Sequence, residues 1–129
     1  MSGTQQSESI IAAKAYAFAL GIIKLYKGLI ERKEFILSKQ ILRSGTSIGA
    51  NVNEAVSAQS KRDFVHKMSI ALKEARETIY WLRLLKDGDY ISETEFDKMF
   101  TACDELIKIL TKIILTTKEK YINKTNANS

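Results

Sequence analysis

The feature that most constrains this chain is the alternating spacing of three and four residues between its apolar side chains. One segment carries this spacing at Ile11, Ala15, Phe18, Ile22, Leu25 and Leu29. Three later segments repeat it, at Ile41, Gly45, Ile48, Val52 and Ala55; at Phe64, Met68, Ala71, Ala75, Ile79 and Leu82; and at Phe96, Met99, Cys103, Leu106, Leu110 and Ile113. Such spacing places one apolar line along each of four α-helices. Period-two alternation, which a half-buried strand requires, does not extend over any useful length.

The composition agrees with an all-α fold. The chain has 129 residues, no proline and only six glycines, whereas sandwiches and barrels with many tight turns use more of both. One histidine and one cysteine exclude a zinc finger and a disulfide scaffold. The length fits one domain that spans residues 1–129.

Capping residues separate the four segments. Ser60 and Ser92 are each followed three positions later by an acidic residue, a pattern typical of a helix N-terminus. Ser7 is expected to cap the first helix, and Gly88 to take the left-handed conformation after the third. We predict helices over 7–31, 34–58, 60–87 and 92–124, with a frayed tail at 123–129. Short connections make successive helices antiparallel, so the predicted fold is an antiparallel up-down-up-down four-helix bundle.

The stretch 43–51 is poor helix material, because it contains Gly45 and Gly49 among several short polar residues. We interpret the glycines as positions of close packing within a continuous helix. One alternative is a helix break that presents the Ser, Thr and Asn side chains to a ligand. Another is a helix-turn-helix with its turn at 45–50, which the unbroken apolar line opposes. A phosphate loop is excluded, because the glycine spacing is wrong and no Lys follows.

The chain is basic, with 20 Lys and Arg against 15 Asp and Glu, and this balance suits a polyanionic partner. The basic excess lies in residues 1–88. The apolar stretch 10–30 invites a membrane interpretation, but Lys14, Lys24 and Lys27 interrupt it. Each lysine would cost about 2.5–3.5 kcal/mol at a bilayer centre. We therefore expect a bundle helix of a cytoplasmic protein that has no membrane partner.

A second line of side chains on the predicted helix 60–87 forms what we call the basic stripe. Its members are Arg62, His66, Ser69, Lys73, Arg76, Tyr80 and Arg83. Its cations could neutralise phosphates, and Tyr80 could stack on a base. The alternative is a solvated helix face, with Lys73 and Arg76 paired to Glu77 and nearby acids.

Apolar residues also lie outside the four apolar lines. The predicted helix 7–31 has a wider apolar arc than one core requires, and Ile70, Trp81 and Leu84 add to the excess. This excess predicts a second burial surface, and therefore a homo-oligomer whose interface includes Ile70, Trp81 and Leu84.

No catalytic, metal or cofactor site is expected. His66 has no partner at catalytic spacing, and Cys103 belongs to an apolar line. The adjacent Asp104 and Glu105 fit a solvated helix face. The sequence therefore predicts a protein without enzyme activity.

Two long segments resemble the signature of one bacterial family. They are residues 35–55, FILSKQILRSGTSIGANVNEA, and residues 61–85, KRDFVHKMSIALKEARETIYWLRLL. Together they are similar to the bacterial four-helix bundle family that includes the 23S rRNA intervening sequence proteins, over about residues 8–120. One departure is Val52-Asn53, where Ile-Ala is usual.

The resemblance implies an antiparallel four-helix bundle without known catalytic residues. It also implies a ring-shaped homopentamer, as in the related accessory variability determinant proteins of diversity-generating retroelements. Those relatives bind a reverse transcriptase and nucleic acid through a basic surface. The matching basic positions here are Arg43, Arg62, Lys73, Arg76 and Arg83. Our leading hypothesis is a nucleic-acid-binding accessory oligomer whose partners are RNA or DNA and a reverse transcriptase or other protein. The alternatives are a protein-interaction scaffold and, less favoured, a helix-turn-helix regulator.

Overall fold

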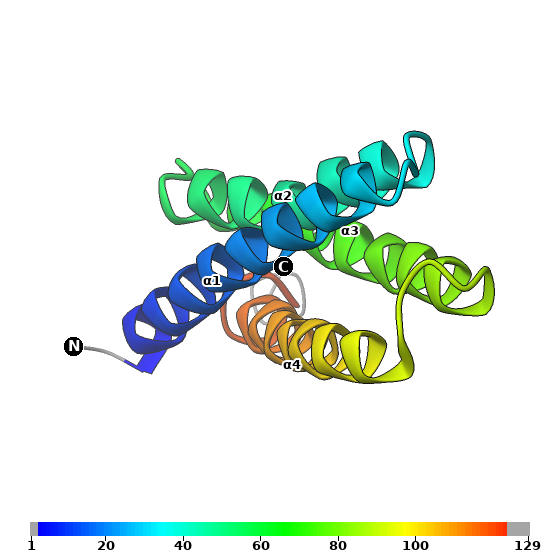
Figure 1. Cartoon of the computed structure of the whole chain (residues 1–129). Coiled ribbons are helices and arrows are strands. Elements are labelled where there is room, and N and C mark those ends of the chain that lie inside the picture. The colour runs from blue at the N-terminus through cyan, green and yellow to red at the C-terminus, as the bar shows by residue number, and fades with distance from the viewer. Residues whose placement is uncertain (1–2, 124–129) are drawn as a thin grey trace.

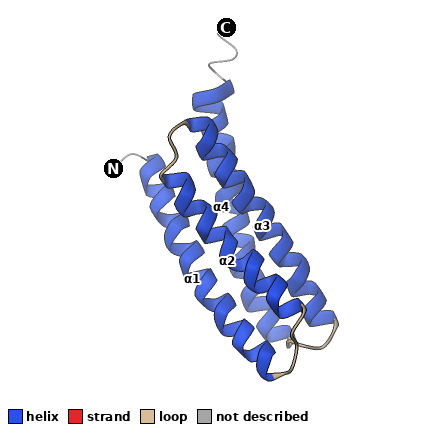
Figure 2. Cartoon of the chain, turned by 90° about the horizontal axis from the view of Figure 1, so that it is seen from above, coloured by secondary structure: helices blue, strands red, loops and turns tan. Residues whose placement is uncertain are grey.

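The computed structural model describes residues 3–123 and confirms a four-helix bundle (Figure 1). Its elements are α1 (Gly3–Glu31), α2 (Leu37–Val56), α3 (Lys61–Asp87), α4 (Glu93–Thr117) and a terminal π-helical turn, η1 (Lys118–Asn123). The four long helices run side by side along one common direction (Figure 2). Each of α1 and α3 packs against both α2 and α4, so among the described residues α1 and α3 are diagonal to each other.

The core forms where the four apolar lines face one another. Ile11, Ile22, Ile48 and Leu110 are fully buried, as the spacing predicts. Two predicted core positions, Ile79 and Met99, are only half-buried. The described residues also include buried positions that the apolar spacing did not include, among them Ser44, Val65, Thr78 and Leu85.

Two of the buried hydroxyls, those of Ser44 and Thr78, form a hydrogen bond with each other, whereas the buried Ser38 hydroxyl has no partner among the described residues. The Thr78 hydroxyl is 2.9 Å from the Ser44 Oγ on α2 and 2.8 Å from the Glu74 carbonyl oxygen of its own helix. Because the Ser44 and Thr78 hydroxyls both have partners, the α2–α3 contact buries these two groups without a large desolvation cost.

The caps of α3 and α4 follow the sequence. The Ser60 Oγ accepts a hydrogen bond from the Asp63 N–H at 3.0 Å. Ser92 and Glu95 form a reciprocal capping box, in which each side chain accepts from the other residue's backbone N–H. Partial burial raises the pKa of Glu95, but the backbone hydrogen bond from Ser92 and the Arg32 guanidinium outweigh it, so this pKa lies below its usual value.

The first connection differs from the prediction, because α2 begins at Leu37 rather than at residue 34. The Glu34 carboxylate turns toward the helix start and accepts hydrogen bonds from the N–H groups of Ile36 at 3.0 Å and Ser38 at 2.7 Å. Lys33 takes the left-handed conformation just before it, with φ of 63°. Glu34 therefore caps the helix from outside it, and its charge interacts favourably with the helix N-terminus.

Other helix ends also differ from the expectations. Ser7 lies inside α1, which already begins at Gly3, so Ser7 is not its cap. Gly88 has φ of −84°, and Asp89 takes the left-handed conformation instead, with φ of 65°. The fourth α-helix ends at Thr117, and the predicted extension to 124 is the π-helical turn η1. The expected frayed tail falls, from residue 124 onward, outside the described residues.

The glycine-rich stretch is part of one continuous helix, which rules out a helix-turn-helix turn at 45–50. Three of its polar side chains donate hydrogen bonds to backbone carbonyl oxygens one turn earlier in the helix. Thr46 donates to Leu42 at 2.7 Å, Ser47 to Arg43 at 2.6 Å and Asn51 to Ser47 at 2.8 Å. These bonds occupy the groups that a helix break would have offered to a ligand.

The two glycines of this stretch are not equivalent. A Cβ atom at Gly45 would lie 2.6 Å from the Ile22 Cγ1 of α1, so only glycine allows the observed approach. A Cβ atom at Gly49 would lie 3.5 Å from the nearest atom, the Ala15 carbonyl oxygen, which is an ordinary contact. Close packing is therefore required at Gly45 and not at Gly49.

Within the described residues, one helical segment, Gln6–Glu31, is long and apolar enough by composition to cross a membrane. A core helix of a bundle passes the same test. Here the segment packs against α2 and α4, and its Lys14 forms an ion pair with Glu105 of α4 at 2.6 Å.

The glycine pair yields a matched test of packing. Gly45→Ala should lower the free energy of unfolding by about 1–3 kcal/mol, because the new methyl overlaps the buried Ile22. Gly49→Ala should raise it by up to about 1 kcal/mol, because alanine favours the helix and meets no obstacle. Urea denaturation followed by circular dichroism measures both. Equal effects of the two substitutions would contradict the packing account.

Candidate nucleic-acid interface

The structure places the basic stripe along the outer face of α3. Arg62, His66, Lys73, Arg76, Tyr80 and Arg83 are exposed, and Ser69 is half-buried. The buried line of α3 lies on the opposite side, while α2 and α4 cover the two flanks. The 21 steps from Arg62 to Arg83 span about 31 Å at 1.5 Å per residue. The stripe is thus one continuous exposed surface within the chain.

Arg43 of α2 forms ion pairs with Glu74 and Glu77, two glutamates of α3 beside this surface. Its guanidinium lies 3.1 Å from the Glu74 carboxylate and also contacts the Glu77 carboxylate. Arg43 is therefore not a free cation, although the sequence placed it among the candidate binding residues. Among the described residues, the alternative pairing of Lys73 and Arg76 with Glu77 does not occur, because the Glu77 carboxylate contacts Arg43 of α2.

The consequence is an uncompensated row of cations. In the part of the chain that the structure describes, no ion pair involves Arg62, Lys73, Arg76 or Arg83. The neighbouring Lys67 differs, because it pairs with Glu54 of α2 at 3.0 Å. Its hydrogen bond to Glu54 raises the pKa of Lys67 above the usual value.

Tyr80 adds the one aromatic ring of the stripe. Its side chain is 53% exposed and meets Trp81 edge-on, with ring centroids 5.2 Å apart and an interplanar angle of 68°. Trp81 is half-buried, and its indole N–H is buried without a hydrogen-bond partner. One face of Tyr80 can therefore receive a flat ligand while Trp81 supports its edge.

The predicted interface residues lie beside the stripe. Ile70, Trp81 and Leu84 share one line of α3 with Glu74 and Glu77, the line that borders α2. All three are half-buried within the chain. They offer less free apolar surface than the sequence suggested.

A more exposed apolar surface lies on α1, and we call it the outer line of α1. It consists of Tyr16, Leu20 and Ile23, which are 67%, 52% and 37% exposed. The wide apolar arc of this helix was the signal for it in the sequence, but not for which residues it comprises.

One contact near the stripe had no signal in the sequence. The Lys61 ammonium lies 4.5 Å from the centroid of the Tyr121 ring, which belongs to η1. The two residues are 60 positions apart, and only the bundle brings η1 to the start of α3. This contact extends the aromatic and basic surface beyond Arg62.

The remaining candidate groups show no reactive arrangement. Within residues 3–123 no three His, Cys, Asp or Glu side chains cluster in a way that could hold a metal ion. His66 is exposed on the stripe. Cys103 is fully buried and its thiol lies 3.3 Å from the Ala75 carbonyl oxygen. Burial, with a smaller effect from the Asp104 charge, raises the pKa of Cys103 to about 12.

Known proteins resemble the chain in sequence and fold. Residues 7–112 match the model of the family described as 23S rRNA-intervening sequence protein. A crystal structure of a protein with unknown function, from the S23 ribosomal protein family of Bacteroides thetaiotaomicron VPI-5482, is 50% identical to it. That similarity covers 84% of this chain and 97% of the other, with a TM-score of 0.83. No curated protein matches the chain.

The reactivity of the Cys103 thiol tests whether this side chain is buried as the structure shows. Cys103 should not react with iodoacetamide at pH 8 in the folded protein, because it is buried and its raised pKa leaves almost no thiolate. In denaturant one thiol per chain should react, and mass spectrometry counts it. The variant Thr101→Cys with Cys103→Ala supplies an exposed thiol on the same helix as a reactive control. Rapid labelling of the native Cys103 would contradict the burial.

Proposed function

The chain belongs to the 23S rRNA-intervening sequence protein family, and from this premise we propose that it is a non-enzymatic homo-oligomer that binds RNA or DNA. The binding surface is the basic stripe of α3. We propose that it acts in the cytoplasm as an accessory factor, with a reverse transcriptase or another protein as partner. The single observation that carries the proposal is the uncompensated row of cations on α3.

Arg43 explains why this row suits a polyanion. Acidic residues on α3 would repel phosphates if they faced outward with the stripe. Arg43 instead holds Glu74 and Glu77 against α2, at a distance of 3.1 Å for Glu74. The lysine and arginines of the stripe remain available to phosphates, whose neutralisation releases counterions. Arg43 thus supports the surface through the two glutamates rather than by touching nucleic acid.

The chemistry of the stripe favours binding without strong sequence preference. Its cations Arg62, Lys73, Arg76 and Arg83 follow one another after 11, 3 and 7 residues, or about 16.5, 4.5 and 10.5 Å along the helix. Such contacts recognise the backbone, and Tyr80 adds a stacking surface that accepts any base.

Oligomerisation would strengthen this binding. The outer line of α1 and the line of α3 that carries the half-buried Ile70, Trp81 and Leu84 beside Glu74 and Glu77 are two different faces, as a head-to-tail ring requires. Resemblance to the accessory retroelement proteins suggests five subunits. A ring would present one stripe per subunit, so weak single contacts would add by multivalency. The exposed outer line of α1 equally supports the second candidate, a protein-interaction scaffold with no nucleic-acid role.

The oligomer is tested by light scattering with size-exclusion chromatography. We expect about five times the chain mass of 14.6 kDa. Leu20→Glu should give monomers, because a carboxylate in an apolar interface is strongly disfavoured. Leu115→Glu on α4, a similarly exposed leucine outside both faces, is the matched control and should leave the mass unchanged. A wild-type monomer at micromolar concentration would refute the oligomer.

Nucleic-acid binding is tested by mobility shift with labelled single-stranded RNA and DNA. The wild type should bind at low salt, and affinity should fall steeply as salt rises. Lys73→Glu with Arg76→Glu should abolish binding while the circular dichroism spectrum and the oligomeric mass stay unchanged, because both residues are exposed.

The control is Lys24→Glu with Lys98→Glu, which makes the same change in charge on the side of the bundle between α1 and α4 and should bind as the wild type does. Undiminished binding by the stripe variant would refute the stripe. No binding by the wild type would favour the scaffold.

A further inference from the structure

We propose that the groove between α1 and α4 is a docking site for an acidic amphipathic helix of a partner protein. This groove is separate from the basic stripe, because in the described bundle α1 and α3 are diagonal to each other. The proposal therefore does not depend on nucleic-acid binding. It names the kind of segment by which a protein partner would be held.

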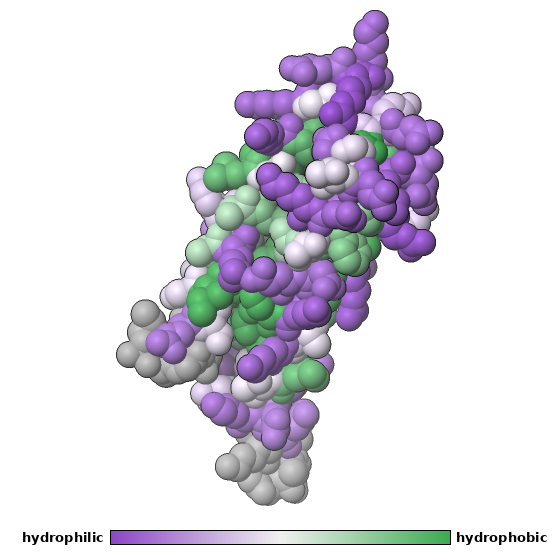
Figure 3. Space-filling view, turned by 60° about the horizontal axis from the view of Figure 1, so that its bottom comes forward, coloured by the Kyte–Doolittle hydropathy of each residue, from purple (hydrophilic) through white to green (hydrophobic). Residues whose placement is uncertain are grey.

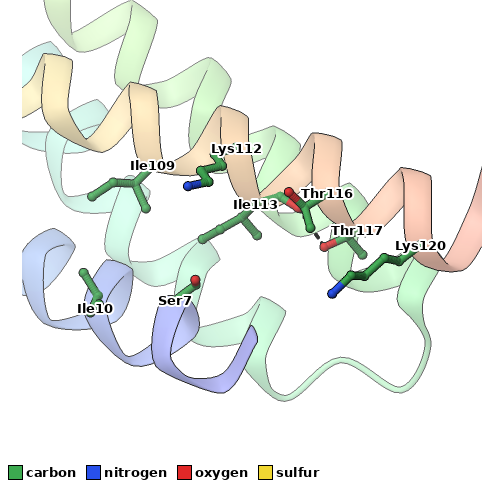
Figure 4. A pocket seen from close by; sticks show the side chains of 8 residues that line it. All are labelled: Ser7, Ile10, Ile109, Lys112, Ile113, Thr116, Thr117 and Lys120. Carbon is green, nitrogen blue, oxygen red and sulfur yellow. Dashed lines mark hydrogen bonds between the residues drawn. The ribbon is translucent and has the colours of Figure 1, made fainter. Parts of the chain in front are cut away.

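The groove is a succession of three hollows along the α1–α4 contact, with volumes of about 410, 270 and 360 Å³. The first lies between the start of α1 and the end of α4, where Ser7 and Ile10 point toward Ile113 (Figure 4). The last reaches Arg32 and Glu95 at the other end. From Ser7 to Arg32 the wall of α1 extends about 37 Å. This length accommodates several turns of a third helix.

The floor of the groove is the bundle's own core. Phe18, Leu25 and Leu106 lie beneath it and are buried, and its accessible apolar surface comes from Ile10, which is 49% exposed, and the half-buried Met99 and Ile109. Of the four neighbouring helix pairs, α1 and α4 pack least extensively against each other. The face turned forward in Figure 3, toward α4, accordingly carries a band of hydrophobic side chains between hydrophilic ones. An apolar helix face laid in this band would complete the cover that α1 and α4 leave open.

The rims of the groove define the charge of the occupant. Its lining includes six cations but only two carboxylates. Lys14 holds Glu105 at 2.6 Å, and Arg32 holds Glu95 at 3.3 Å. The other cations have no ion-pair partner among residues 3–123; they are Lys24, Lys98, Lys112 and Lys120. An occupant with acidic flanks beside an apolar stripe matches this arrangement.

On the α1 side of the groove, two glycines leave the helix backbone without side chains. Gly21 and Gly28 are seven residues apart and both line it. Neither has a positive φ. A Cβ atom at Gly28 would meet nothing within 4 Å, and one at Gly21 would be an ordinary 3.6 Å from the Met99 Cε. Glycine weakens a helix interior relative to alanine, and no contact among residues 3–123 requires glycine at these two positions. A second backbone that approaches closely does explain it.

Two other occupants fit less well. A second copy of this chain carries a net charge of +5, so its approach to four unpaired lysines is electrostatically unfavourable. A nucleic acid would meet the lysines but would leave the apolar floor without a partner. Both remain as outcomes of the experiment.

The probe is a synthetic fluorescein-labelled peptide with three heptads, leucine at positions a and d and glutamate at the flanking positions. At about 21 residues it forms a helix about 31 Å long, which fits the groove. A peptide of the same composition with scrambled leucine positions is the control. Fluorescence anisotropy with the full chain should show saturable binding of the amphipathic peptide, at least about tenfold tighter than that of the scrambled one.

Two variants test the location of binding. Lys24→Glu with Lys98→Glu reverses the charge at two positions of the rims, and Gly28→Phe adds a ring to the groove at a position where a Cβ atom meets nothing within 4 Å. Each should weaken peptide binding at least about tenfold. Lys73→Glu with Arg76→Glu, which makes the same charge change on the basic stripe, should bind the peptide as the wild type does. Circular dichroism confirms that all variants fold.

Several outcomes would overturn the proposal. The first is equal affinity for the two peptides, or none for either. Equal loss in the stripe variant would show that the attraction is one of net charge alone. A changed oligomeric mass in Gly28→Phe would identify the groove as an interface between copies. Loss of RNA binding in Lys24→Glu with Lys98→Glu would identify it as a nucleic-acid site. Failure of the stripe to bind RNA leaves this proposal intact, so the two proposals fail separately.

Discussion

The bundle depends on the burial of four apolar lines against one another, and where Ile22 meets Gly45 that burial leaves no space for a side chain at position 45. Ile22 fills the volume that any side chain at position 45 would need. The contact fixes how closely α1 approaches α2, because a methyl group there would force the helices apart. The polar pair of Ser44 and Thr78 lies one residue away and joins α2 to α3. The positions of three helices are therefore coupled at one level of the core.

The same helix that provides this contact also shapes the surface. Arg43 lies next to Ser44 but points outward, and it draws Glu74 and Glu77 toward α2. Two adjacent residues of α2 thus link the core to the surface. Ser44 contacts α3 inside the bundle, and Arg43 contacts α3 on its outside. Loss of the Arg43 cation would leave two glutamates near the stripe without their partner, which weakens its positive potential without removing any of its own cations.

The molecule offers three surfaces of different chemistry. The stripe of α3 is basic and bears one exposed ring, the outer line of α1 is apolar, and the groove between α1 and α4 combines an apolar floor with basic rims. In the described bundle α1 and α3 are diagonal, so the proposed nucleic-acid surface and the groove need not compete. An accessory factor that joins a polyanion to a protein requires separate surfaces of this kind.

Much of this architecture is determined by the sequence alone. The spacing of the apolar residues specifies four helices, Ser60 and Ser92 specify two of their starts, and the residues of the stripe fall on one helix face because helical periodicity is local. The first residue of α2 could not be predicted from a capping motif, because the Glu34 side chain takes the place of a Ser, Thr, Asp or Asn cap at the helix start. Only the tertiary structure decided which charges neutralise each other. Arg43 lies 31 and 34 positions from its glutamates, and Lys61 lies 60 from Tyr121, so no local pattern encodes these partners. The space available for a side chain also differs among Gly45, Gly49 and Gly28, and local sequence does not encode this difference. It depends on the distance to neighbouring helices that are remote in sequence.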